Sequence, residues 1–191
     1  MPALTGRTPA IVFGKFRDHL SKLLNQTVTD ARLSVVCVRG DNKAMLSFRR
    51  SDKPVAAPLR SKSLFFYVGQ NVEVEKDGSG EWRLRTVQYR YWIQGDDSEN
   101  TDSWFFRFEY VSRKIRSKTH PRHHLHLPCT LECGGQTISL KRAHIPTGWV
   151  TLEEVIRFII NDLGVKPKSD DWDKILLKSE EQFRDWTSRT I

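Results

Sequence analysis

Four of the six histidines in this chain fall within one stretch of seven residues, His120–His126. Imidazole titrates near pH ~6.5, so at neutral pH one histidine can accept a proton while another donates one. Alternate positions of a strand share a face, so an extended segment sets His124 and His126 side by side and turns His123 away. The spacing therefore predicts a pair of neighbouring imidazoles suited to acid–base chemistry.

The same residues allow two other interpretations. Imidazole and thiolate ligands suit zinc, and Cys129, Cys133 or His144 could complete a ligand set with His124 and His126. Against a zinc finger, three residues separate the two cysteines and no second Cys or His pair follows at finger spacing. The simplest interpretation is a solvated basic loop that enters a strand. The sequence leaves all three interpretations open.

The chain around the histidines is cationic. Between residues 113 and 126 there is no Asp or Glu, and there are five cations, Arg113, Lys114, Arg116, Lys118 and Arg122. A basic run beside aromatic side chains is typical of a groove that binds a nucleic-acid backbone. We expect these cations to contact phosphates, and Tyr89, Tyr91 and Trp92 to stack on bases.

Two arginines lie on runs that alternate with period two, residues 87–93 and 104–110, which together predict a β-hairpin. If the loop between them closes symmetrically, residues whose numbers sum to 197 face each other, and Arg90 lies opposite Arg107. Directly opposed arginines repel unless an anion or a carboxylate such as Glu109 compensates. Next to the histidines, this pair would stabilise the charge that develops on a phosphorane.

Histidine and arginine without a cluster of carboxylates argue against two-metal nucleases, which need several Asp or Glu side chains. They favour metal-independent cleavage of RNA, in which one imidazole takes the 2′-hydroxyl proton and another protonates the leaving 5′-oxygen. DNA lacks that hydroxyl. The catalytic set predicted from the sequence is therefore His123, His124, His126, Arg90 and Arg107, with RNA as partner and no cofactor. A non-catalytic nucleic-acid-binding module and a zinc-dependent phosphoesterase are the alternatives.

Short motifs within residues 80–163 resemble a known family. They are Tyr89-Arg90-Tyr91-Trp92, Phe105-Phe106-Arg107-Phe108-Glu109, Pro121-Arg122-His123-His124-Leu125-His126 and a helix that starts Thr-Leu-Glu-Glu-Val. Together they resemble the TumE family of prokaryotic toxin–antitoxin systems. The resemblance implies a ribonuclease toxin that pairs with a DNA-binding antitoxin. It assigns the family's histidine positions to His123, His124 and His126, and its basic positions to Arg90 and Arg107.

The elements that must position these residues form an α+β domain over residues 1–191, with an N-terminal helix, an antiparallel sheet of about six strands and two C-terminal helices. Thr8 is expected to cap the first helix and Ser169 the last, and Thr151–Glu154 is a capping box. Residues 1–80 are the N-terminal helix and hairpins, an extension relative to the toxin-like portion, residues 81–191. In the predicted hairpin, the alternation of residues 104–110 is expected to place Trp104 on the same face as Phe106.

Composition limits the class of protein. The 191 residues carry a net charge of +8 and 20 aromatic side chains, and apolar residues make up 38%. The longest apolar runs, such as Leu64–Val68, are far shorter than the ~18–20 residues of a membrane span, and the N-terminus has no apolar stretch typical of a signal peptide. Three cysteines favour a reducing compartment. We therefore expect a cytoplasmic domain that binds no membrane.

Overall fold

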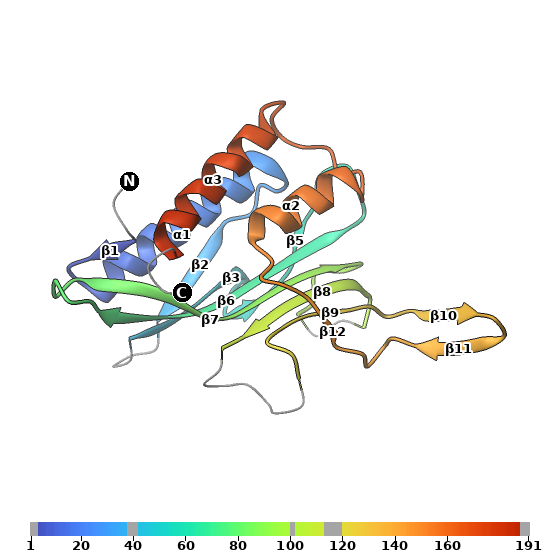
Figure 1. Ribbon diagram of the computed structural model, residues 1–191. Coiled ribbons are helices and arrows are strands. Elements are labelled where there is room, and N and C mark those ends of the chain that lie inside the picture. The colour runs from blue at the N-terminus through green and yellow to red at the C-terminus, as the bar shows by residue number, and fades with distance from the viewer. Residues whose placement is uncertain (1–3, 38–41, 100–101, 113–119, 188–191) are drawn as a thin grey trace.

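The computed structural model describes residues 4–37, 42–99, 102–112 and 120–187. Figure 1 shows a large antiparallel sheet with all three helices on one of its faces. The predicted α+β class is confirmed, with one N-terminal and two C-terminal helices. The helices are α1 (Pro9–Thr27), α2 (Leu152–Asn161) and α3 (Trp172–Thr187). None of these described helices combines the length and the apolar character that crossing a lipid bilayer requires.

Seven strands form the main path of the sheet. In order of pairing they are β12 (Ile145–Pro146), β9 (His123–His126), β8 (Trp104–Val111), β7 (Trp82–Gln94), β6 (Phe65–Lys76), β3 (Lys43–Arg50) and β2 (Leu33–Cys37). Three two-residue strands pair with this path at β7, β3 and β6, and are respectively β1 (Thr5–Gly6), β4 (Lys53–Pro54) and β5 (Ala57–Pro58). A separate hairpin, β10 (Thr130–Cys133) and β11 (Gln136–Ser139), projects from the body in Figure 1.

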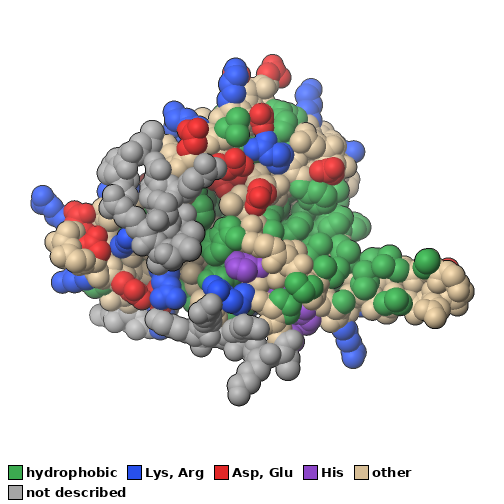
Figure 2. All heavy atoms as spheres, viewed as in Figure 1, with side chains coloured by type: hydrophobic (Ala, Val, Ile, Leu, Met, Phe, Trp, Pro, Cys, Tyr) green, Lys and Arg blue, Asp and Glu red, His purple; other side chains and the backbone are tan. Residues whose placement is uncertain are grey.

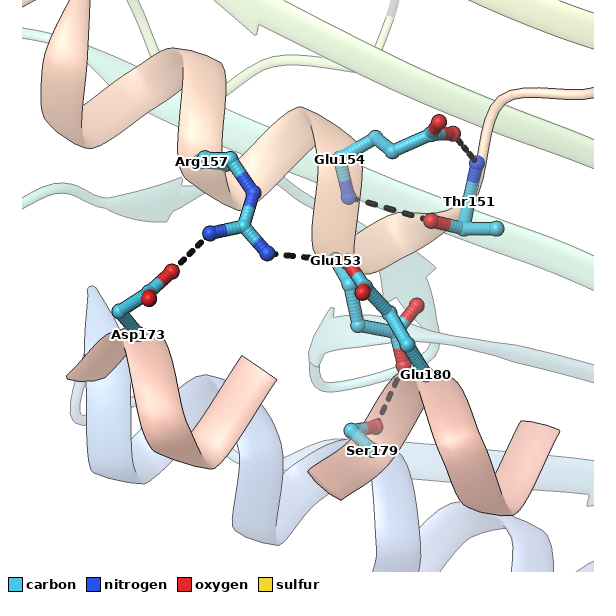
Figure 3. Close-up of polar contacts among 7 residues, drawn as sticks. All are labelled: Thr151, Glu153, Glu154, Arg157, Asp173, Ser179 and Glu180. Carbon is cyan, nitrogen blue, oxygen red and sulfur yellow. Dashed lines mark hydrogen bonds and ion pairs between the residues drawn. The ribbon is translucent and has the colours of Figure 1, made fainter. Parts of the chain in front are cut away.

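Local capping residues set the helix ends. Thr8 accepts a hydrogen bond from the backbone N–H of Ile11 at the start of α1, as predicted. The predicted capping box of α2 is also present, since the side chain and backbone of Thr151 bond reciprocally with Glu154 (Figure 3). Ser169 accepts from a backbone N–H two residues on, and α3 then begins at Trp172.

The hydrophobic core lies between the sheet and the helix layer. Its buried side chains come from both halves of the described chain, for example Phe16 of α1, Leu46 of β3, Ile93 of β7 and Ile156 of α2. Strand β6 pairs with β7 along its whole length. Residues 1–80 and 81–191 therefore share one sheet and one core, and the β8 side chains Phe106 and Phe108 pack against α2.

Polar contacts join the two C-terminal helices, as Figure 3 shows. Arg157 on α2 forms ion pairs with Asp173 and Glu180 on α3. The Ser179 hydroxyl of α3 donates a hydrogen bond to the buried Glu153 carboxylate of α2. These contacts hold α3 against α2 within the helix layer.

The register between β7 and β8 differs from the prediction by two residues. Arg90 pairs with Glu109, and Trp92 pairs with Arg107, so the expected Arg90–Arg107 pairing is wrong. The loop closes one residue later than a symmetric closure would, and an irregularity in the pairing next to Gln94 adds another residue. The observed register removes the repulsion of two opposed arginines, because each of them faces a carboxylate or an indole instead.

The irregularity also reverses one side chain. Phe106 and Phe108 pack against Phe158 of α2, on the face expected for them. Trp104 does not join them, because the extra residue beside it shifts the alternation, and its ring lies against Arg107 on the opposite face. Alternation alone could not reveal this change.

Candidate functional site

Strands β7, β8 and β9 lie side by side, and their residues alternate between two faces. The helix face packs against α2 and Trp149, and we call the opposite one the outer face. Two cross-strand rows on the outer face, in the order β7, β8, β9, are Arg90–Glu109–His124 and Trp92–Arg107–His126. We call these six residues, together with Trp104 and His144, the outer-face cluster.

Three imidazoles converge in this cluster. His124 and His126 project from β9, and His144 directly precedes β12, which pairs with β9. Each histidine offers a ring nitrogen, and these nitrogens all lie within 4.8 Å of one another. The ring centroids are 4.5–5.0 Å apart, and the ring of His120 stacks on that of His144 at 3.9 Å. The predicted neighbours His124 and His126 are therefore together, and the fold adds His144 to them.

His124 is the anchored member of the group, with only 4% of its surface exposed. Its Nδ1 lies 3.0 Å from the backbone carbonyl oxygen of Pro121, which can only accept a hydrogen bond. Nδ1 is therefore assigned as the protonated nitrogen, which leaves the Nε2 lone pair available. Nε2 lies 3.8 Å from Oε2 of Glu109, whose Oε1 accepts a hydrogen bond from the indole of Trp92 at 2.9 Å.

Arg107 is held between two indole rings. Its guanidinium carbon lies 4.4 Å from the centroid of Trp92 and 4.3 Å from that of Trp104. Burial lowers the pKa of Arg107 from its usual value, but a guanidinium keeps its charge at neutral pH. The guanidinium carbon of Arg90 lies 5.8 Å from the centroid of the Trp92 ring, and Arg90 pairs with Glu109 of β8. The outer face therefore presents Arg107 next to the imidazoles, and Arg90 two strands away from them beyond Glu109.

The three tyrosine and tryptophan residues expected to stack on bases are buried, so that expectation is wrong. Tyr89 and Tyr91 stack on each other at 4.6 Å within the core on the helix face. Trp92 is 7% exposed because one of its neighbours, Tyr67, stacks on it at 4.7 Å while Arg107 also packs against it. Core packing satisfies their ring faces, so they support the site and leave no ring face open to a base.

His123 lies on the helix face, so the sheet separates it from the other predicted catalytic histidines. Its ring stacks on Tyr110 at 4.6 Å and meets the edge of Trp149 at 5.3 Å. Arg122 donates to the Tyr110 hydroxyl at 3.3 Å. The predicted roles of His123 and Arg122 therefore have no support from proximity to the cluster. The other four predicted phosphate contacts lie outside the described residues: Arg113, Lys114, Arg116 and Lys118.

Burial and repulsion from neighbouring histidines lower the pKa values of two clustered imidazoles, His126 and His144. Burial, followed by the charges of His124 and His144, lowers the pKa of His126 to about 4. Burial and neighbouring histidines also lower the pKa of His144. At neutral pH these rings can accept a proton or bind a metal ion, whereas His126 is a poor general acid.

The cluster is also the place where the described residues could hold a metal ion. His124, His126 and His144 form a group of three nitrogen ligands, which does not include Cys129 or Cys133. The sequence named His144 only as one possible member of a ligand set, and the pairing of β12 with β9 is what brings it to the other two histidines.

Comparisons with models of protein families, with curated proteins and with solved structures found no match to this chain. The resemblance of residues 80–163 to the TumE family therefore stays a prediction.

Proposed function

We propose that the outer-face cluster binds the phosphodiester backbone of RNA and cleaves it. The observation that carries the proposal is the direct pairing of Arg107 with His126 on adjacent strands. His124, two residues before His126, lies on the same face. A guanidinium and several imidazoles at one place are the groups that phosphoryl transfer needs, as charge stabiliser and as activators of the nucleophile.

Arg107 is suited to hold a phosphate. The two flanking indoles restrict its side chain, so the guanidinium is presented in one orientation and loses little entropy on binding. Arginine binds phosphate through two parallel hydrogen bonds, which lysine cannot reproduce. A net charge of +8 on the whole chain would further attract a polyanion.

The choice of RNA follows from its 2′-hydroxyl, an internal nucleophile that DNA lacks. The clustered imidazoles could activate that hydroxyl as bases or as ligands of a metal ion. The resemblance to TumE toxins also favours RNA, and it implies a DNA-binding antitoxin as protein partner. On this proposal Arg90 and Arg107 contact the phosphate, and His124 and His126 act on the nucleophile.

The test uses the full chain with a labelled RNA and a DNA of the same sequence. We expect cleavage of the RNA with 2′,3′-cyclic phosphate ends, and no cleavage of the DNA. Arg107→Lys should lower the cleavage rate by at least about tenfold, because lysine keeps the positive charge but cannot form two parallel hydrogen bonds to the phosphate. Arg60→Lys, at an exposed position away from β7–β9, is the matched control and should leave the rate unchanged.

Two results would contradict the proposal. Salt-sensitive binding of RNA without any cleavage would indicate a nucleic-acid-binding module. Equal rates of RNA cleavage by the Arg107→Lys and Arg60→Lys variants would place the activity elsewhere on the chain.

A further inference from the structure

We propose that His124, His126 and His144 form a binding site for one divalent transition metal ion, with Zn²⁺ as the best fit. All three offer imidazole nitrogen ligands, which suit zinc better than they suit magnesium or calcium. Three protein ligands with a fourth position left open are typical of catalytic zinc sites.

The distances allow the site to close on an ion. Tetrahedral zinc with nitrogen ligands at about 2.0–2.1 Å spaces those nitrogens about 3.4 Å apart. The ring nitrogens here are at most 4.8 Å apart, so the most separated pair must approach by no more than about 1.4 Å. His126 and His144 are only half-buried, so their rings can rotate toward His124, which stays anchored by Pro121.

The hydrogen bonding of His124 matches that of a metal ligand. Histidines that bind metals usually donate their other ring N–H to a backbone carbonyl or a carboxylate, which fixes the tautomer. His124 does so through Nδ1 to Pro121, and its Nε2 is the nitrogen left for the ion. The Glu109 carboxylate, 3.8 Å from that Nε2, would offset the positive charge of the ion and of Arg107.

The tight packing of the rings favours an ion over a phosphate between them. In-line displacement at phosphorus needs the attacking and leaving oxygens on opposite sides of the phosphate. A base and an acid that serve these two oxygens must leave room for the phosphate between them. Imidazoles whose centroids lie 4.5–5.0 Å apart leave no such room, whereas a single ion fits among three nitrogens.

Metal binding itself stands apart from RNA cleavage, and only its catalytic consequence rests on the proposed function. A 2′-hydroxyl bound to the zinc would lose its proton more readily at neutral pH, with the phosphate held by Arg107. The imidazoles would then serve as ligands, which replaces the metal-independent roles predicted for them from the sequence.

The test measures metal content and affinity on the full chain, prepared without a histidine tag and stripped with a chelator. After addition of Zn²⁺ and removal of the excess, we expect about one zinc per chain. Co²⁺ added in its place should give the visible absorption of a tetrahedral site. His126→Gln and His144→Gln should each lower the zinc affinity strongly. The loss should exceed the factor of about 10–100 that is typical when a residue hydrogen-bonded to a metal ligand is removed.

Several controls keep the result clear. His19→Gln removes a histidine that packs between helices and should keep one zinc per chain. If His124→Gln fails to fold because its side chain is buried, the half-buried His126 and His144 still provide the test. No bound zinc at micromolar concentrations of the free ion, or binding that both variants retain, would overturn the metal site.

The metal site and the RNA proposal can fail separately. Stoichiometric zinc without cleavage of RNA would leave the metal site in place and refute the proposed function. Cleavage that persists in chelator, by protein that binds no zinc, would support the proposed function and refute the metal site.

Discussion

His19 on α1 lies against α3, where its Nε2 is 3.0 Å from the hydroxyl oxygen of Ser179. The Ser179 hydrogen is donated to the Glu153 carboxylate, so His19 Nε2 is assigned as the donor to the serine oxygen. Burial, followed by the charge of Lys22, lowers the pKa of His19 from 6.5 to about 4. The folded protein therefore keeps this imidazole neutral over a pH range in which the unfolded chain protonates it.

This difference sets the sign and the size of an effect on stability. The unfolded state binds the extra proton, so the contribution of His19 is fully present above pH 6.5 and is lost as the pH falls toward the folded pKa. With pKa values of 6.5 and about 4, the free energy of unfolding falls by about 2 kcal/mol between pH 7 and pH 5. The Glu153 carboxyl acts with the opposite sign, because burial raises its pKa and its contribution is lost as the pH rises.

The assay is urea unfolding of the wild type and of His19→Gln at pH 7 and at pH 5, in chelator so that metal binding does not contribute. Glutamine can still donate a hydrogen bond to Ser179 but does not titrate. We expect the wild type to lose about 2 kcal/mol more than the variant over this pH range. Equal losses in the two proteins would refute the reasoning, because they would mean that the folded state accommodates a protonated His19.

Three further predictions concern the cap of α2, a buried hydrogen bond and the phosphate contact. Thr151→Ala removes the capping box and should lower the free energy of unfolding by about 1 kcal/mol, whereas Thr137→Ala on the exposed β11 should change it by less than about 0.5 kcal/mol, both measured by chemical denaturation. Tyr91→Phe removes the acceptor that Gln70 uses at 2.5 Å within the core, so it should destabilise the fold by about 1–3 kcal/mol; a change near zero would mean that Gln70 finds another partner. Arg107→Ala should lower by about one the magnitude of the slope of log RNA affinity against log salt concentration, measured by fluorescence anisotropy. An unchanged slope would show that Arg107 contacts no phosphate.

The projecting hairpin β10–β11 connects the two parts of the histidine cluster. Leu131 and Ile138 pair across it with about half of each side chain exposed, and Figure 2 shows hydrophobic side chains along the projection. The hairpin leaves the sheet after β9 and returns the chain to β12, directly beside the strand it left. This return is what places His144 next to His126.

The sequence by itself determined the local features of this protein. Thr8 and Thr151 identify the helix starts because a cap and the N–H groups it satisfies lie within three residues. The alternation of residues 87–93 and of the histidines predicts which side chains share a face, because strand periodicity is also local. For that reason His124 and His126 were found together and His123 was found on the other face.

Only the tertiary structure decided what depends on residues distant in the sequence. The pairing of Arg107 with Trp92 follows from where a loop closes and where the ladder becomes irregular, and period-two alternation is the same for either register. Trp92 is buried because Tyr67 of the neighbouring strand covers it, which its own sequence neighbours do not reveal. His144 joins the cluster through cross-strand pairing beyond a hairpin, so its role follows from topology and not from spacing.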